Sequence, residues 1–171
     1  MDLIARKLPA KGGVNVMALT QLLMGFAKEN AGHAILGKQV EAFQKACGEW
    51  GKVNGFLMQA AGKRDMLTPL LGATNYLALM GDLVTSYVLL HQATVAWRKL
   101  EPLCKEAGID GTDMAAVIKL AGENAEVRFL LGKVKTAQFF VAHELPNLYA
   151  KAASVMSGDQ SSMEMLWEAD E

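Results

Sequence analysis

Residues 123–155 read ENAEVRFLLGKVKTAQFFVAHELPNLYAKAASV and carry apolar side chains at spacings of three and four. This spacing is the period of one face of an α-helix. The stripe consists of Val127, Leu130, Val134, Ala137, Val141, Leu145, Leu148, Ala152 and Val155. We therefore predict a long amphipathic helix from Glu123 to Val155. Because Pro146 has no N–H and crowds the carbonyl four residues earlier, we expect a kink near Ala142.

A second long helix is predicted from Asn75 to Glu106, with Thr74 or Asn75 as its N-cap and Pro102 as the point where it would break. One face carries Tyr76, Met80, Leu83, Tyr87, Leu90, Thr94, Trp97 and Leu100. The opposite side is also apolar, through Leu77, Val84, Val88, Leu89 and Val95. We expect a helix with two apolar sides to contact neighbours on more than one face and to be central.

Two further long helices are predicted over Val14–Glu29 and Leu36–Ala61, and a short one over Met114–Leu120. The core side of the Leu36–Ala61 helix would carry Val40, Phe43, Cys47, Trp50, Val53 or Asn54, and Leu57. Its glycines at 37, 48, 51 and 55 lower helix propensity but permit close helix approach.

These helices and the turn-like segments between them predict an all-α fold, an antiparallel four-helix bundle with a kinked last helix and a short C-terminal tail. No segment between them is long enough to be an interdomain linker. We therefore expect a single helical domain over 1–171. It would comprise a lead-in at 1–13, the bundle at 14–157 and an acidic tail at 158–171.

Composition argues against several classes of protein. Of the 171 residues, 51% are hydrophobic and 20% are charged, which suits a globular domain. The formal net charge of −1 provides no global field for nucleic acid or an anionic membrane, so neither is an expected partner. Cys47 and Cys104 form no C-x-x-C pair, which argues against a thiolate zinc site and a disulfide scaffold. With no signal peptide or transmembrane segment predicted, we expect a cytoplasmic protein.

The end of the chain differs in charge from the rest. Residues 159–171 contain five acidic residues and no basic one, whereas residues 1–158 contain 17 basic and 13 acidic residues, a net +4. The acidic residues are Asp159, Glu164, Glu168, Asp170 and Glu171, and the apolar residues between them are Met163, Met165, Leu166 and Trp167. Apolar residues in an acidic segment favour a tail that folds back on the bundle, with a partner-binding peptide as the alternative.

The histidines do not form a metal-binding pattern. A di-iron or di-manganese carboxylate centre needs Glu-x-x-His pairs that face inward one turn apart, and the sequence contains none. His33, His91 and His143 stand at unrelated positions, and Glu144 points roughly 100° away from His143 around a helix. We therefore expect no metal site. His91 is interpreted as a hydrogen-bonded structural histidine rather than a catalytic base.

Three other polar or thiol residues invite a functional reading. Asp82 lies in the apolar helix and is interpreted as a surface or helix-interface carboxylate paired with a lysine or arginine, with a functional acid as the alternative. Cys47 and Cys104 lack an activating neighbour and are predicted to be buried core thiols.

Two basic segments are interpreted as structural. The turn Lys11–Gly12–Gly13 could present N–H groups to an anion, but it lacks the P-loop pattern and is interpreted as a simple turn. Arg128, Lys133 and Lys135 make the start of the last helix basic and are interpreted as a solvated or domain-facing edge. We assign no catalytic, cofactor-binding or metal-binding residue.

Three segments resemble parts of a known enzyme family. They are LIARKLPAKGG at 3–13, ATNYLALMG at 73–81 and KVKTAQFFVAHELP at 133–146. In this order and separation they resemble the C-terminal helical domain of the long bacterial acyl-CoA dehydrogenases, the group that includes 3-methylmercaptopropionyl-CoA dehydrogenase. The resemblance covers essentially the whole chain. Asn75 stands where the family usually has proline, Gln138 stands where arginine is common, and the loop at 108–113 is longer.

The resemblance implies that the parent enzyme oxidises an acyl-CoA to its 2-enoyl-CoA, with a glutamate removing the α-proton and FAD accepting the hydride. The family places that glutamate and the FAD contacts in preceding domains, and no matching segment occurs in these 171 residues. The leading hypothesis is therefore a non-catalytic accessory domain that packs on the dehydrogenase core or its subunit interface. On this hypothesis residues 1–13 lead in from the core, and the chain is a fragment or a free-standing relative of the appended domain.

Two alternatives are retained. An independent adaptor or homodimeric module would bury the Tyr76–Trp97 surface against another protein or a second copy of the chain. A free-standing enzyme would be yellow from bound flavin, or would turn over an acyl-CoA with an electron acceptor.

Overall fold

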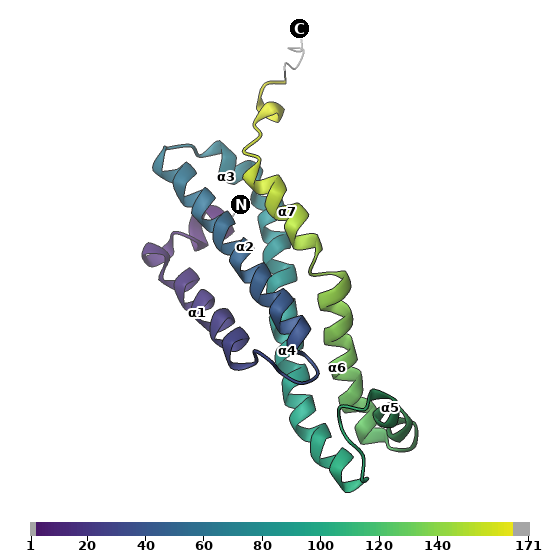
Figure 1. Ribbon diagram of the computed structural model, residues 1–171. Coiled ribbons are helices and arrows are strands. Elements are labelled where there is room, and N and C mark those ends of the chain that lie inside the picture. Colours follow the sequence, from purple (N-terminus) through teal and green to yellow (C-terminus); the bar gives the residue numbers. More distant parts are fainter. Residues whose placement is uncertain (1–2, 166–171) are drawn as a thin grey trace.

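The computed structural model describes residues 3–165, and within that range it contains helices and turns but no strand. The predicted all-α fold is therefore confirmed (Figure 1). The elements are η1 (Leu3–Lys7), η2 (Ala10–Gly13), α1 (Val14–Glu29), α2 (Gly37–Gly62), α3 (Leu67–Leu71), α4 (Ala73–Glu106), α5 (Met114–Glu123), α6 (Ala125–His143), α7 (Asn147–Met156) and η3 (Ser161–Met163). The tail residues Leu166, Trp167, Glu168, Asp170 and Glu171 lie outside the described range.

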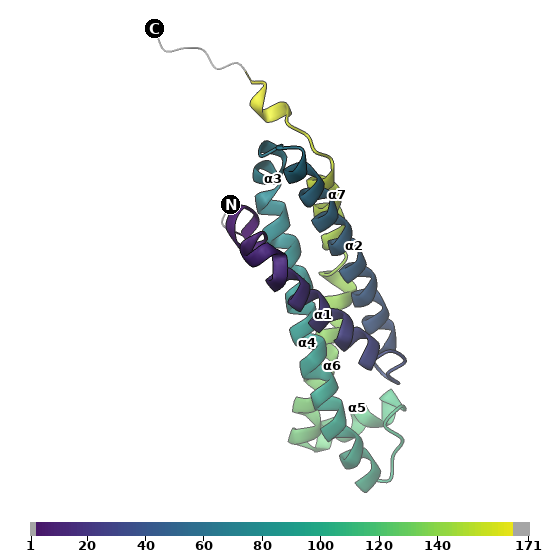
Figure 2. The same cartoon turned by 90° about the vertical axis from the view of Figure 1, so that its left-hand side faces the viewer.

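The chain direction alternates between the long helices. In Figure 1, α1 descends, α2 ascends, α4 descends, and α6 and α7 ascend. The longest helix, α4, contacts α2, α6 and α7, as expected of a central helix. Helix α1 packs on α2 and α5 packs on α6. Figure 2 shows α1 on the outer side of the molecule, in front of α4.

All nine residues of the apolar stripe in 123–155 are buried, but eight of them lie on two separate helices and Leu145 lies in the turn between these helices, instead of all nine lying on one kinked helix. Helix α6 ends at His143 and α7 begins at Asn147, so the break comes after the expected position at Ala142. The N–H groups of Glu144 and Leu145 both donate to the carbonyl of Phe140, at 2.8 and 3.1 Å. Since proline cannot donate the next helical hydrogen bond, α6 ends there and a new helix starts after it.

Helix α4 passes through Pro102 and continues to Glu106, so the expected break is absent. Its N-cap is Gly72 and no side chain caps it, so the prediction of Thr74 or Asn75 as the cap is wrong. Asn75 instead donates from Nδ2 to Ser154 Oγ on α7, at 2.8 Å. This polar side chain is used between helices because the start of α4 lies beside α7.

Side chains cap the N-terminal ends of α5 and α6. Asp113 Oδ1 accepts from the N–H groups of Ala115 and Ala116 at the start of α5. Asn124 Oδ1 accepts in the same way from Glu126 and Val127 at the start of α6. Helix α5 consequently runs three residues beyond its expected end at Leu120, and the last stripe begins after Asn124.

The core lies between α4 and the helices around it. The predicted core face of α4 is confirmed, because its residues are fully buried except for Met80 and Tyr87, which are partly buried. On α2 the predicted core residues are buried, with Val53 rather than Asn54 in the core. The short helix α3 was missed by the sequence analysis, which expected only a turn-like segment between the second and third long helices.

Candidate docking surface

Two apolar grooves flank the N-terminal segment formed by η1 and η2. The first, which we call the Tyr76 groove, has a volume of about 550 Å³ and lies between this segment, α1 and α4. It is lined by Leu3, Lys7, Leu8, Asn15, Val16, Leu19, Trp50, Ala73, Tyr76, Leu77 and Met80. Lys7 is the charged residue in this lining, so the groove offers mainly apolar surface.

The second groove, which we call the methionine groove, has a volume of about 410 Å³ and lies between the same segment, the end of α2 and α3. It is lined by Ile4, Leu8, Pro9, Gly12, Gly13, Val16, Met17, Asn54, Leu57, Met58, Ala61, Met66, Pro69 and Leu70. Met17, Met58 and Met66 are 61%, 76% and 60% exposed. Methionine is flexible and polarisable, which suits a surface that must fit another apolar surface.

The outer side of α4 also carries exposed apolar side chains. Leu77, which lines the Tyr76 groove, is 60% exposed, and Val88 and Val95 are exposed on the same helix. The sequence analysis expected this side to contact neighbours, but within residues 3–165 these three side chains lie largely open to solvent. Contiguous exposed apolar surface is typical of an interaction site, whereas scattered exposed residues are not.

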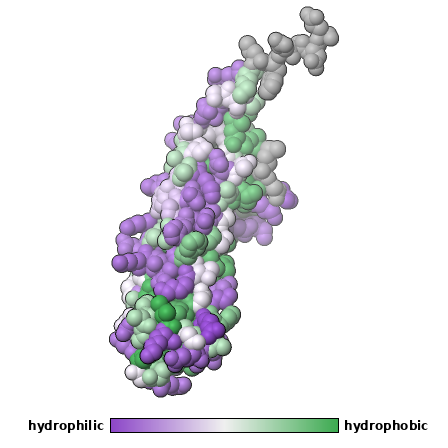
Figure 3. Space-filling model, turned by 90° about the vertical axis from the view of Figure 1, so that its right-hand side faces the viewer, coloured by the Kyte–Doolittle hydropathy of each residue, from purple (hydrophilic) through white to green (hydrophobic). Residues whose placement is uncertain are grey.

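We call the two grooves together with Leu77, Val88 and Val95 the docking face. Figure 3 shows apolar surface gathered near the end of the molecule where the C-terminal tail leaves, with another apolar patch towards the opposite end. Exposed Ile118 on α5 lies outside the docking face and provides a matched reference residue.

A buried hydrogen-bond chain holds the floor of both grooves. Tyr76 Oη accepts from Trp50 Nε1 at 3.0 Å and donates to Asn54 Oδ1 at 2.7 Å. Burial raises the pKa of Tyr76 to about 12, so its hydroxyl stays protonated and can donate at neutral pH. Trp50 and Tyr76 line the first groove and Asn54 lines the second. The sequence analysis missed this chain, although buried tyrosine and tryptophan each need a polar partner.

The turn at Lys11–Gly12–Gly13 sets the course of the N-terminal segment. These residues have φ angles of 52°, 67° and 82°, in the left-handed region that glycine adopts without steric cost. Gly12 and Gly13 also line the methionine groove, where side chains would reduce its width. Residues 11–13 therefore form a tight turn directly before α1.

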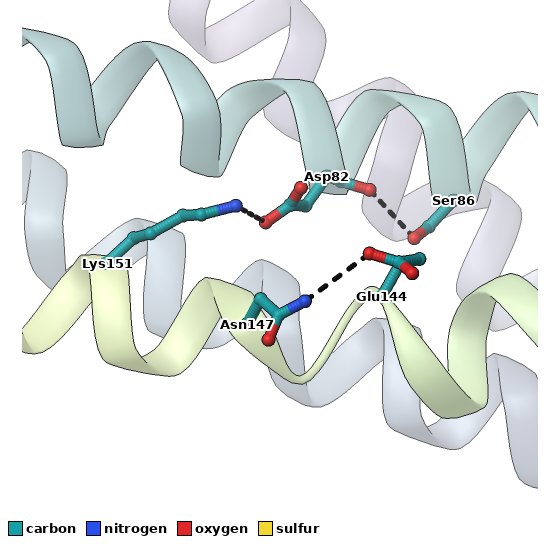
Figure 4. A network of polar contacts seen from close by, with 5 residues as sticks. All are labelled: Asp82, Ser86, Glu144, Asn147 and Lys151. Atoms are coloured by element: carbon teal, nitrogen blue, oxygen red, sulfur yellow. Dashed lines mark hydrogen bonds and ion pairs between the residues drawn. The ribbon is translucent and has the colours of Figure 1, made fainter.

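Asp82 joins two helices. Its Oδ2 lies 2.5 Å from Lys151 Nζ on α7, and both side chains are largely buried (Figure 4). Nearby, Ser86 Oγ donates to the Asp82 carbonyl at 2.8 Å and Asn147 Nδ2 donates to Glu144 Oε2 at 3.4 Å. The prediction of a helix-interface carboxylate paired with a lysine is confirmed. Each of these contacts satisfies a polar group at the α4–α7 boundary.

The three histidines lie apart and have different environments. His33 Nδ1 accepts from the N–H groups of Ile35 and Leu36, both at 3.2 Å, just before α2. His143 is exposed, with its ring centroid 4.6 Å from that of Phe139. Within residues 3–165, no three His, Cys, Asp or Glu side chains converge as a metal site would require.

His91 is exposed and its ring lies against Phe26 and Tyr87, with centroids 6.1 and 6.0 Å away. Its interpretation as a hydrogen-bonded histidine is wrong for the described part of the chain, where its contacts are with aromatic rings. The apolar helix misled the prediction because His91 lies on its outer side.

The two cysteines are buried, as predicted. Burial raises the pKa of Cys47 to about 12 and also raises the pKa of Cys104, because the thiolate is poorly solvated in the core. Neither thiol therefore has the lowered pKa that a reactive cysteine needs.

The basic start of α6 is partly structural. Arg128 donates to the carbonyls of Ala121 and Gly122 at the end of α5, both at 2.9 Å, and Lys133 Nζ lies 5.4 Å from the Phe129 ring centroid. Lys135 is exposed, as a solvated edge residue would be. Further along, Gln138 Nε2 donates to the Ile35 carbonyl at 3.2 Å, which ties α6 to the α1–α2 loop.

Comparison with protein families assigns the chain. The model for the acetyl-CoA dehydrogenase C-terminal-like family matches residues 17–166. The chain belongs to this family. The match extends from α1 through α7, so the helices that form the docking face are part of the acetyl-CoA dehydrogenase C-terminal-like domain. No curated protein and no solved structure matches the chain.

The family assignment supports the resemblance at the level of a C-terminal accessory domain of acyl-CoA dehydrogenases. Among residues 3–165, no helix has both the length and the apolar composition that a membrane span requires.

Proposed function

We propose that this acetyl-CoA dehydrogenase C-terminal-like domain is a non-catalytic accessory domain of a FAD-dependent acyl-CoA dehydrogenase. Its docking face would pack on the catalytic core or at the subunit interface. The observation that carries the proposal is the contiguous apolar surface around residues 3–13, with three methionines more than half exposed. Apolar surface of this kind gains stability when a partner removes it from water.

The position of the docking face suits a partner attached before residue 3. The N-terminal segment borders both grooves, so a domain joined to it would lie close to both. Lys7 and Lys11 are exposed beside the grooves and favour acidic groups around the apolar contact on the core.

The parent reaction in this proposal is oxidation of an acyl-CoA to its 2-enoyl-CoA. FAD would supply the hydride acceptor from the preceding domains. The grooves of this chain do not suit FAD, because their linings are apolar with Lys7 as the charged member, whereas a diphosphate needs several donors. This chain would then stabilise the enzyme without taking part in the reaction. Helices α1, α2, α4 and the α6–α7 pair would act together as a four-helix unit.

The homodimer alternative needs a surface other than the Tyr76–Trp97 surface that the sequence analysis assigned to it. The Tyr76–Trp97 side of α4 is the core of this chain and is closed to a second copy. A dimer would therefore compete with the dehydrogenase core for the docking face, and the same experiment separates the two.

The test uses the acyl-CoA dehydrogenase core produced together with this chain. Met17→Glu with Met66→Glu places two charges in the methionine groove, and Ile118→Glu places one at an equally exposed site on α5. We expect the groove variant to lose co-purification with the core and to lower the temperature at which the core releases flavin. The Ile118→Glu variant should match the wild-type chain in both measurements.

Equal retention of the core by both variants would contradict docking through this face. Sedimentation of the chain alone measures whether it forms a dimer. A stable dimer that Met17→Glu with Met66→Glu dissociates would replace the accessory role with self-association.

A further inference from the structure

The hydrogen-bond chain below the two grooves has a fixed direction. Trp50 Nε1 can only donate, so Tyr76 Oη must accept from it. The single hydroxyl hydrogen of Tyr76 then goes to Asn54 Oδ1, at 2.7 Å. Asn54 is therefore held with its amide oxygen towards Tyr76. Within residues 3–165, no group accepts a hydrogen bond from the remaining polar atom, Asn54 Nδ2.

This unused donor belongs to an apolar groove. Asn54 is half-buried and lines the methionine groove, whose volume is about 410 Å³. Among the residues that line this groove, it has the one side chain that can donate a hydrogen bond. Small-molecule sites typically measure about 300–1,000 Å³ and combine apolar walls with a few placed polar groups. The methionine groove therefore has the size and composition of a site for a small, mainly apolar ligand.

One end of the methionine groove is positively charged. Lys63 and Arg64 are exposed just before Met66, which lines the groove. Neither forms an ion pair within residues 3–165. Asp65, the acidic residue of the same turn, already accepts from Gln160 Nε2 at 3.2 Å. An anionic group at this end would therefore meet two cations that have no other partner.

The donor and the cations are separated along α2. Asn54 lies within the helix, and Lys63 is its C-cap residue, nine positions later. Nine positions correspond to about 13 Å along a helix axis, and the long basic side chains can bring their charge closer to the groove. A ligand that uses both ends therefore carries an anionic group at one end of a short apolar chain and a hydrogen-bond acceptor near the other.

We infer that the methionine groove binds an oxo fatty acid, an alkyl carboxylate with a carbonyl oxygen near the far end of its chain. The carbonyl accepts from Asn54 Nδ2, the alkyl chain covers the apolar walls, and the carboxylate meets Lys63 and Arg64. An extended peptide fits less well, because its backbone presents polar groups at every residue and the groove offers one side-chain donor. This inference goes beyond the proposed function and concerns the chain without the core.

The test titrates the full chain with 9-oxodecanoate and follows the methionine methyl resonances by NMR. We expect saturable shifts for Met17, Met58 and Met66, which line the groove. Met24 and Met114 do not line it and should keep their positions. Decanoate has the same carboxylate and chain but no carbonyl acceptor. It should bind about 2- to 10-fold more weakly, the loss expected for one hydrogen bond.

A variant of Asn54 isolates the donor. Asn54→Asp keeps an oxygen that can accept from Tyr76 but removes the Nδ2 donor. This variant should bind 9-oxodecanoate no better than decanoate. Asn75→Asp makes the same chemical change outside the groove and should keep the wild-type preference for 9-oxodecanoate.

A second pair of variants isolates the charge. Lys63→Gln with Arg64→Gln removes both cations and should weaken the binding of 9-oxodecanoate and decanoate by the same factor. Lys38→Gln with Lys135→Gln removes two lysines from other helices and should leave both affinities unchanged.

Equal affinity of the wild-type chain for the two probes would overturn the inference. So would shifts that do not saturate, or that affect Met24 and Met114 as strongly, because they would show detergent-like binding. A chain that retains the core in the co-purification test but binds neither probe would keep the docking role and lose the ligand site. A chain that binds 9-oxodecanoate selectively but does not retain the core would give the opposite outcome.

Discussion

The imidazole of His33 holds the start of α2 through an acceptor atom. Nδ1 receives the N–H groups of Ile35 and Leu36, which would otherwise lack partners before the first helical turn. A protonated imidazole carries a hydrogen on Nδ1 and cannot accept these bonds. The local structure therefore needs the neutral form of His33.

Lowering the pH should destabilise the fold through this residue. Burial and the nearby Arg98 lower the pKa of His33 from its ordinary value of 6.5, and Glu101 opposes them. As the pH falls, the unfolded chain binds a proton at His33 before the folded chain does. The stability contribution is therefore complete above about pH 6.5 and is lost as the pH falls through the lower, folded pKa. Urea unfolding in steps from pH 7.5 to 5 measures this loss.

The variant His33→Asn isolates the effect, because its amide oxygen can still accept the two N–H groups but does not titrate. Its stability should depend less on pH over this range. His91→Gln removes an exposed imidazole and should keep the wild-type dependence. An unchanged dependence in His33→Asn would show that other groups are responsible.

At the scale of the element, α2 has an unusual outer side. Gly48, Gly51 and Gly55 are exposed, and a Cβ placed on any of them meets nothing within 4 Å. The sequence analysis connected these glycines with close helix approach, but among the described residues 3–165 no other helix packs against them. Glycine at these positions lowers the helix propensity of α2, and no close helix contact compensates for this loss.

Gly51→Ala should therefore stabilise the protein by about 0.5–1 kcal/mol, because alanine loses less conformational entropy in a helix. Gly72→Ala is the matched opposite, since its Cβ would lie 3.2 Å from Val155 Cγ1 and 3.4 Å from the Thr68 carbonyl oxygen. That variant should be less stable than the wild type. Chemical denaturation of both variants checks the difference, and a destabilised Gly51→Ala would mean that another surface covers α2.

The last stripe shows how an element is divided. The apolar period identified nine buried positions from Val127 to Val155, and it missed only the buried Leu131 beside Leu130. It did not reveal that Phe140 accepts two N–H groups where α6 ends, because this depends on how the chain turns before Pro146. Pro102 has the opposite outcome, and α4 continues through it.

At the scale of the whole molecule, the Asp82–Lys151 pair connects α4 and α7 across 69 residues of sequence. Asp82→Asn or Lys151→Met alone should lower the free energy of unfolding by about 1–3 kcal/mol, because each leaves a largely buried charge without its partner. The double variant should lose less than the sum of the two. A double-mutant cycle by urea unfolding measures this coupling.

The exposed pair Glu41 and Lys45, 2.7 Å apart within α2, provides the control and should show a much smaller coupling. If the two cycles gave the same coupling, burial would not be what strengthens the Asp82–Lys151 contact.

The docking face also belongs to this scale. Its parts come from the N-terminal segment, α1, α2, α3 and α4, and no motif in the sequence marks them as one surface. The sequence did indicate a second apolar side on α4, but it placed that side against neighbours of the same chain. Only the packing of the helices shows that one side of α4 is buried and that the other side is exposed.

The sequence alone determined the all-α class, the helix over Val14–Glu29 and the buried stripes, because helical period is a property of consecutive residues. Tertiary structure alone decided that Tyr76 bridges Trp50 and Asn54, that Asp82 meets Lys151, and that two grooves stay open beside residues 3–13. These features depend on which distant segments meet in space, and the spacing of residues along one helix carries no information about that meeting.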